Sequence, residues 1–282
     1  MPLLTEELIA RSNELPSLPT IYFDLKEAIN DPRSTSSTIG RIISNDQALA
    51  ARLMRLANSS FYGFPTSVDN IGDAITLIGL QQTRDLALAT FVIDVFKGMS
   101  DDLVDINSFW KHSIGTGICS RLFAAERREH KTEKFFLIGL LHDIGRLLMF
   151  IRMPKEASEV LQRCRESGEL EYRVEREIFG CDHAELGGRI LQKWQLPQGV
   201  CEAVHCHHQP GVAQIAITET AIVHVSDVVI NSLALGSSGA THVPPLSNEA
   251  WNRLGIKPGA LPMIVEELDR QMADVSRILT SR

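Results

Sequence analysis

The nine histidines are the residues of this 282-residue chain that could do the most chemistry, and most of them fall in its second half. His142 and Asp143 are adjacent within the apolar segment Phe135–Phe150. An unpaired imidazole and carboxylate would be costly to bury there, and a bound metal ion would compensate for both. The alternative is a histidine and an aspartate that are satisfied within an ordinary helix turn.

Two further patterns contain metal-ligand residue types. His224 and Asp227 are three residues apart, which places them on one face of a helix with apolar neighbours. The run His205–His208, with the sequence HCHH, presents four soft or borderline ligand types in succession. The alternatives are an aspartate paired with a buried base and an exposed polar helix end, where histidines suit the helix dipole.

His112 and His183 are unremarkable individually, but the ligand-type residues together have a defined order. That order is His112, His142-Asp143, His183, His207-His208 and Asp227. It resembles the HD superfamily of metal-dependent phosphohydrolases. The resemblance implies that one metal ion is bound by His112, His142, Asp143 and Asp227. By analogy with branches that bind two ions, it also implies a second ion on His183, His207 and His208, with Asp143 bridging the two.

Three segments in the first half of the chain indicate a more specific family within this superfamily. They are LPSLPTIYFDLKEAIND, IGRIISNDQALAARLMRLANSSFYGFP and SVDNIGDAITLIGLQQTRDLALA. They resemble the HDOD family, the HD-related output domain of bacterial signalling, over about residues 15–235. The resemblance implies an all-α fold in which an N-terminal helical bundle packs on an HD-type helical core. HDOD proteins are generally regarded as regulatory modules, and many have lost the HD ligands that this chain retains.

The chain also departs from related branches of the superfamily. Phosphodiesterases of the HD-GYP branch carry a GYP motif after the paired histidines, whereas this chain continues as PGVA, so we do not expect hydrolysis of cyclic di-GMP. Ser108 stands where that branch often has Glu. Arg146 replaces the usual Lys, and an arginine can still bind a phosphate in bidentate fashion. If the site is catalytic, we expect Asp143 to hold the metal and Arg146 or Lys111 to stabilise phosphate charge.

Helical periodicity runs through the whole chain, and no alternating pattern with hairpin turns stands out. A polar stretch with a glycine, Lys97–Asp105, predicts a boundary between domains at residues 1–100 and 101–282, the second ending in a tail helix. Phe135–Phe150 is expected to be one core helix, and Ser67 or Asp69 is expected to open a helix that ends at Gly79. Other helices are expected near residues 20–30, 46–56, 80–96, 109–126, 182–194, 197–209, 216–235 and 263–279.

Composition restricts the class of protein further. Hydrophobic residues make up 44%, charged residues 22%, and mean hydropathy is −0.01, which excludes wholesale disorder. The net charge of −7 argues against nonspecific binding of nucleic acid or of anionic membranes. No segment is expected to span a membrane, and the acidic N-terminal stretch 1–16 does not resemble a signal peptide. The five cysteines predict free thiols and a cytoplasmic location, and Cys119, Cys164 and Cys201 are expected to be buried.

Two functions remain open at this point. One is a regulatory output module that binds a signalling protein partner, or a nucleotide or phosphate ligand, and receives its input in trans. The other is an active metal-dependent phosphohydrolase that acts on a phosphoester. Mixed histidine and carboxylate ligands suit one or two divalent Fe, Mn, Ni or Zn ions. A third, weaker interpretation is that the histidines only pack. Family resemblance favours the regulatory module.

Overall fold

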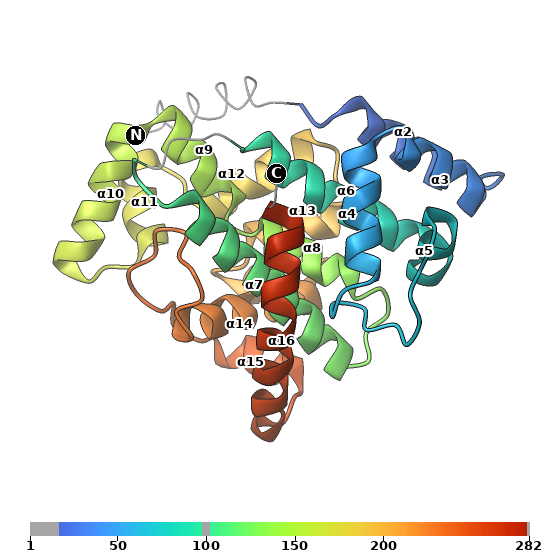
Figure 1. Ribbon diagram of the computed structural model, residues 1–282. Helices are drawn as coiled ribbons and strands as arrows, with labels where there is room; N and C mark the ends of the chain where they lie inside the picture. The colour runs from blue at the N-terminus through green and yellow to red at the C-terminus, as the bar shows by residue number, and fades with distance from the viewer. Residues whose placement is uncertain (1–16, 98–101, 281–282) are drawn as a thin grey trace. The chain divides into compact units, whose positions relative to one another are not determined.

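The computed structural model describes residues 17–97 and 102–280, and every regular element within them is a helix (Figure 1). This confirms the all-α prediction. The described residues divide into two compact units, one of residues 17–97 with 266–280 and one of residues 102–265. The domain limits expected at 1–100 and 101–282 stay a prediction. Segment 1–16, in which no signal peptide was expected, lies outside the described residues.

The first unit contains five helices from the first half of the chain. They are α2 (Thr20–Asn30), α3 (Ser36–Ser44), α4 (Gln47–Ala57), α5 (Ile71–Ile78) and α6 (Leu80–Val95). Helix α6 packs against α2, α4 and α5, and its residues from Leu86 to Ile93 are all buried. A helix that is buried on every side needs no amphipathic stripe. The apolar run of α6 is therefore the centre of this unit.

Side-chain caps mark where α4 and α5 begin. Asp46 accepts a hydrogen bond from the backbone N–H of Leu49 and caps α4. Helix α5 is capped by Asn70, which accepts the N–H of Asp73 at 2.9 Å, so the expectation of Ser67 or Asp69 was wrong. Gly79 separates α5 from α6 with φ of 99°, a backbone conformation that favours glycine.

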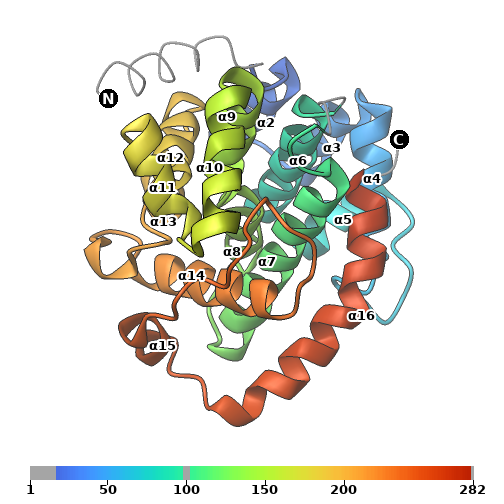
Figure 2. The same ribbon diagram turned by 90° about the vertical axis from the view of Figure 1, so that its left-hand side faces the viewer.

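The last helix, α16 (Leu261–Thr280), contributes its residues from 266 onward to the first unit (Figure 2). Ser60, in the loop that follows α4, donates its hydroxyl hydrogen bond to Oδ2 of Asp274 at 3.1 Å. Ser60 belongs to the ANSSFYG motif on which the resemblance partly depends. This motif therefore forms a loop that docks the C-terminal helix.

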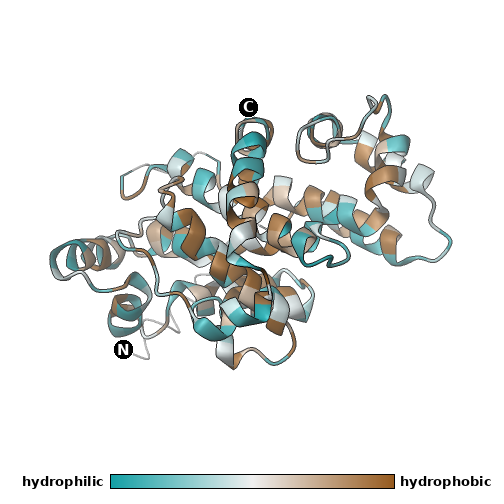
Figure 3. Ribbon diagram, turned by 90° about the horizontal axis from the view of Figure 1, so that it is seen from below, coloured by the Kyte–Doolittle hydropathy of each residue, from teal (hydrophilic) through white to brown (hydrophobic). Residues whose placement is uncertain are grey.

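The second unit carries the candidate site. Its helices are α7 (Ile106–Glu126), α8 (Glu133–Leu141), α9 (Ile144–Arg152), α10 (Pro154–Ser167), α11 (Glu171–Phe179), α12 (His183–Lys193), α13 (Gln198–His205), α14 (Ile217–Ser232) and α15 (Asn248–Leu254). Helix α7 packs against α8 and α14, and α12 packs against α9 and α13. Hydrophilic and hydrophobic residues alternate around many of the helices, as expected of packed amphipathic helices (Figure 3).

Helices α7 and α8 approach each other so closely that only glycine fits at their contact. A Cβ atom added at Gly139 would lie 2.6 Å from the carbonyl oxygen of Thr116, and one added at Gly117 would lie 2.8 Å from that of Phe136. The two backbones are therefore in direct contact. This contact brings His112 of α7 and His142 at the end of α8 to within 3.3 Å through their Nε2 atoms.

The segment Phe135–Phe150 forms two helices, so the expectation of one core helix was wrong. Helix α8 ends at Leu141 and α9 begins at Ile144, and Asp143 has φ of −97° and ψ of 9° between them. Successive side chains diverge by about 100° in a continuous helix. The break lets His142 and Asp143 point to the same place.

The other expected helices match α2, α4, α6, α7, α12, α13, α14 and α16 in position. Helices α3, α10, α11 and α15 were not expected. All five cysteines are buried and free, in agreement with the expected free thiols and with the expected burial of Cys119, Cys164 and Cys201. Within residues 17–97 and 102–280, no helix combines the length and hydropathy needed to cross a membrane.

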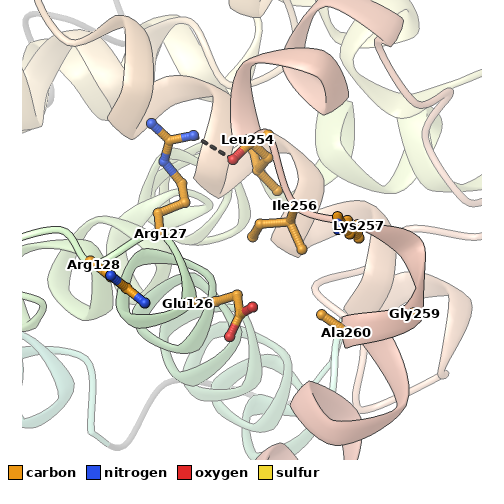
Figure 4. A pocket seen from close by; sticks show the side chains of 9 residues that line it. Glu126, Arg127, Arg128, Leu254, Ile256, Lys257, Gly259 and Ala260 are labelled. Atoms are coloured by element: carbon orange, nitrogen blue, oxygen red, sulfur yellow. Dashed lines mark hydrogen bonds between the residues drawn. The ribbon is translucent and has the colours of Figure 1, made fainter.

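An arginine fixes the end of α15 to the end of α7. Arg127 donates from Nη1 to the carbonyl oxygens of Arg253, at 2.6 Å, and of Leu254 (Figure 4). These are two of the carbonyls that a helix leaves without internal partners at its C-terminus. The hollow beside this contact is lined by Arg128, Lys257 and neighbouring residues.

Candidate metal centre

Four of the predicted ligands converge on one point inside the second unit. Nε2 of His112 lies 3.2 Å from Oδ1 of Asp227 and 3.6 Å from Oδ2 of Asp143. Nε2 of His142 lies 3.3 Å from Oδ2 of Asp143 and 3.4 Å from Oδ1 of Asp227. Ligand bonds of about 2.1 Å to a shared ion place neighbouring ligand atoms roughly 3.0–3.4 Å apart. The spacing of this first ligand group, 3.2–3.6 Å, is therefore close to that expected around a metal ion.

A second ligand group lies beside the first. Its nitrogen atoms belong to His183, His207 and His208 and lie within 4.8 Å of one another. Nε2 of His208 is 2.8 Å from Nε2 of His183. Nε2 of His183 is 3.0 Å from Oδ1 of Asp143. Asp143 thus presents one carboxylate oxygen to each group.

Backbone carbonyls orient two of the imidazoles. Nδ1 of His142 donates to the carbonyl oxygen of Gly139 at 2.7 Å, and Nδ1 of His207 donates to that of Val204 at 2.7 Å. A carbonyl oxygen only accepts, so in each case Nδ1 carries a hydrogen. Where these rings are neutral, Nε2 holds the lone pair that a metal requires. Nε2 of His207 is buried and has no hydrogen-bond partner among the described residues.

The centre is almost closed to solvent. His112, His142, His183 and His207 are fully buried, and Asp143 and Asp227 are at most 4% exposed. His208 alone of the seven is half-buried. Its ring stacks on Tyr172 with centroids 4.4 Å apart.

Buried charges shift the titration of the site. Burial opposes ionisation of Asp143 and Asp227, yet the neighbouring histidines hold the pKa of both carboxyls well below its usual range. Burial lowers the pKa of His142, but Asp143 and Asp227 outweigh it and raise this pKa to about 10. Burial and the neighbouring His142 and His183 lower the pKa of His207 to about 3.

Arg146 and Lys111, the predicted phosphate-stabilising residues, lie in different surroundings. Arg146 is buried, and its Nε lies 3.3 Å from Oδ1 of Asp143. The charges of Asp143, Glu175 and Glu171 raise the pKa of Arg146 against the effect of burial. Lys111 is exposed and forms no ion pair within the described part of the chain. It lines a separate hollow at the start of α7.

One residue that shapes the site could not be assigned from the sequence. Glu175 of α11 is buried and accepts hydrogen bonds at Oε2 from Nδ1 of His183, at 2.6 Å, and from its backbone N–H, at 2.8 Å. Carboxylates that orient ligand histidines in this way are common in metal sites. The only sequence feature that could have indicated Glu175 is its spacing of one helix turn from Glu171. The sequence also suggested His224 as a ligand, but both of its ring nitrogens are already hydrogen-bonded.

The residues fit a transition-metal ion. Imidazole nitrogens and carboxylate oxygens are ligands that Fe, Mn, Ni and Zn accept. The unpartnered Nε2 of His207 has a partner if an ion binds, and the convergent carboxylates have their charge balanced. His205, the remaining histidine of the HCHH run, is exposed and belongs to neither ligand group.

The helical fold and this histidine–aspartate arrangement define an all-α protein of the HD type. The model of the HDOD domain family matches residues 15–210, more than half of the chain. The chain therefore belongs to the HDOD family, as its motifs predicted.

Individual relatives agree with this family. An uncharacterised protein of Treponema pallidum (strain Nichols) is 24% identical over 206 residues, which are 73% of this chain but only 40% of that protein. An HDOD domain protein of unknown function from Geobacter sulfurreducens has a TM-score of 0.79 at 24% identity, with 99% and 97% of the two chains covered. A protein from Shewanella amazonensis SB2B, provisionally named a phosphohydrolase, has a TM-score of 0.77 at 23% identity, with 97% and 98% covered. At this identity, the solved structures support the fold alone.

Proposed function

We propose that this chain is a regulatory HDOD protein of signal transduction that holds one or two divalent transition-metal ions in an HD-type centre. The proposal rests on one observation: the expected metal-ligand residues lie together, and they are almost fully buried. A complete set supports metal binding, and burial favours an ion that the protein keeps over one that meets a substrate. We further propose a cytoplasmic location and a signalling protein as partner.

Each of the two ligand groups would hold one ion. His112, His142, Asp143 and Asp227 would hold the first ion, and Asp143, His183, His207 and His208 the second. When bound, such an ion supplies Lewis acidity. Arg146 balances the negative charge of Asp143, and Glu175 fixes the ring of His183. These contacts hold the ligands in place before any ion arrives.

The second candidate is an active phosphohydrolase for a nucleotide or another phosphoester. The intact ligand set favours it, as does the provisional name of the Shewanella protein. Asp143 would then hold the ion, and Arg146 or Lys111 would stabilise phosphate charge. A phosphate would have to enter a centre whose ligand residues are almost fully buried, and Lys111 would have to leave its exposed position. Hydrolysis of cyclic di-GMP is not part of this proposal, because the GYP motif is absent.

One experiment separates the two candidates. Protein loaded in turn with Mn, Fe, Ni or Zn is incubated with nucleotides, cyclic nucleotides and p-nitrophenyl phosphate, alongside the Asp143→Ala variant. The regulatory proposal predicts that the wild-type protein retains metal and turns over no faster than the variant. Turnover by the wild-type protein that is lost in the variant would establish the phosphohydrolase instead.

A further inference from the structure

His224 connects the second ligand group to the segment that begins α15. The residue lies on α14, is 3% exposed and precedes Asp227 by one helix turn. Its Nδ1 lies 2.8 Å from the carbonyl oxygen of His207. Its Nε2 lies 2.9 Å from the backbone nitrogen of Ser247. Both ring nitrogens are therefore used within the protein.

These two partners determine which nitrogen of His224 carries the hydrogen. A backbone N–H only donates, so Nε2 of His224 accepts from Ser247. A carbonyl oxygen only accepts, so Nδ1 of His224 donates to His207. The ring is consequently neutral, and it lacks a free lone pair for a metal ion. His224 is a strut between two backbone segments and not a ligand.

At one end, the strut holds the segment that supplies two ligands. His224 holds the carbonyl of His207, while Nδ1 of His207 is held by Val204. The side chain and backbone of His207 are thus both fixed, with Nε2 left unpartnered. His208 follows directly in the chain, and its Nε2 lies 2.8 Å from Nε2 of His183. A shift of this backbone would move two of the three histidines of the second group.

At the other end, the strut holds the N-cap residue of a helix. Ser247 is the N-cap of α15, and its hydroxyl oxygen accepts the N–H of Ala250 at 3.3 Å. Helix α15 packs against α14. It also lies beyond residue 210, where the match to the family model ends. His224 therefore connects the shared HDOD region to the segment that follows it.

We propose that His224 is a positioning residue that couples the docking of α15 to the binding of an ion by the second ligand group. The inference rests on the proposed metal centre and adds a regulatory connection to it. A partner or segment that displaces the start of α15 would loosen the His207–His208 backbone and weaken the second site. The first ligand group, built mainly on α7, α8 and α14, should change much less.

Two substitutions break the strut at opposite ends. The amide nitrogen of Asn resembles Nδ1 of histidine in position, so His224→Asn keeps a donor for His207 and loses the acceptor for Ser247. The amide oxygen of Gln resembles Nε2, so His224→Gln keeps the acceptor and loses the donor. His224→Phe removes both. His130→Asn, at an exposed histidine, is the matched control.

Two readouts on the full chain follow the two ends separately. Titration with Co²⁺, monitored by its visible absorption, reports each ion, and amide hydrogen exchange reports the N–H of Ser247. We expect His224→Gln and His224→Phe to weaken the second Co²⁺ by about 10–100-fold, the usual effect of losing an outer-shell partner, with the first nearly unchanged. His224→Asn and His224→Phe should lose protection at Ser247. Because coupling links the two ends, bound Co²⁺ should slow exchange at Ser247 in the wild-type protein and not in His224→Phe.

Several results would overturn the inference. One is equal Co²⁺ binding by all variants, and another is equal weakening of both ions in every variant, which would indicate general loss of structure. A third is exchange at Ser247 that does not respond to Co²⁺. If the wild-type protein binds no Co²⁺, the proposed metal centre itself is wrong. In that case, faster amide exchange at Ser247 in His224→Asn but not in His224→Gln would still show that His224 connects the two backbone segments. It would not show any coupling to a metal ion.

Discussion

Oε2 of Glu175 lies 2.6 Å from Nδ1 of His183 and accepts its hydrogen bond, and the same oxygen accepts the backbone N–H of His183. One buried carboxylate thus fixes both the ring and the main chain of a ligand at the start of α12. It also lies near Arg146, whose charge helps to hold the pKa of Glu175 below its ordinary value against the effect of burial. The second ligand group depends on this arrangement.

Replacing Glu175 by Gln should weaken the second ion. The amide has no charge and cannot orient His183 as strongly, so we expect about a 10–100-fold loss of affinity at that group. Isothermal titration with Zn²⁺ or Mn²⁺ measures it. Glu177→Gln, at an exposed position on the same helix, is the control and should bind as the wild-type protein does. Unchanged affinity in Glu175→Gln would show that Glu175 does not position the ligand.

Gly145 should tolerate no side chain. A Cβ atom there would lie 2.1 Å from the carbonyl oxygen of His183, where α9 and α12 meet. Gly145→Ala must push these backbones apart, at a cost of about 1–3 kcal/mol in the free energy of unfolding. Urea denaturation measures the cost. At Gly259 an added Cβ meets nothing within 4 Å, so Gly259→Ala should change stability by less than about 0.5 kcal/mol. Equal stability of the two variants would contradict the close contact.

Glu202 should make stability depend on pH. Its carboxylate accepts the backbone N–H groups of Gln214, Ile215 and Ala216, just before α14. Partial burial raises the pKa of Glu202, but these bonds outweigh it and lower the pKa below its ordinary value of 4.5. A lowered folded-state pKa stabilises the protein above about pH 4.5, and this contribution is lost as pH falls through the folded-state value.

The Glu202→Gln substitution tests this dependence. The variant should be less stable than the wild-type protein at pH 7, and the difference should shrink toward pH 3. Urea midpoints at the two pH values measure it, with Glu159→Gln at an exposed position as the control. A difference that is the same at both pH values would mean that the charge of Glu202 contributes nothing.

The sequence predicted the helical class and the set of ligand residues because both depend on local or ordered patterns. Helical periodicity predicted a helix near residues 46–56, where α4 lies, and the order of histidines and aspartates implied, through its resemblance to the HD superfamily, the two groups that lie together. The roles of these residues as ligands remain predictions.

Features that depend on contacts between distant segments were not predictable. The break at His142 and Asp143 interrupts a continuous apolar run, and nothing in that run marks it. Contacts from other helices hold the break: Asp227 faces His142, and the carbonyl of His183 abuts Gly145. Glu175 could not be assigned from the sequence because its partner His183 lies beyond the end of α11, the helix that carries Glu175.

The metal content of the chain tests the central claim most directly. The measurement is inductively coupled plasma mass spectrometry on protein purified without added metal or chelator, with Asp143→Ala and the exposed-site control His205→Asn alongside. We expect about one or two transition-metal ions per chain in the wild-type protein and the control, and clearly fewer in Asp143→Ala, because that residue faces both ligand groups. Absence of metal from the wild-type protein, even after reconstitution with Mn, Fe, Ni or Zn, would contradict the account.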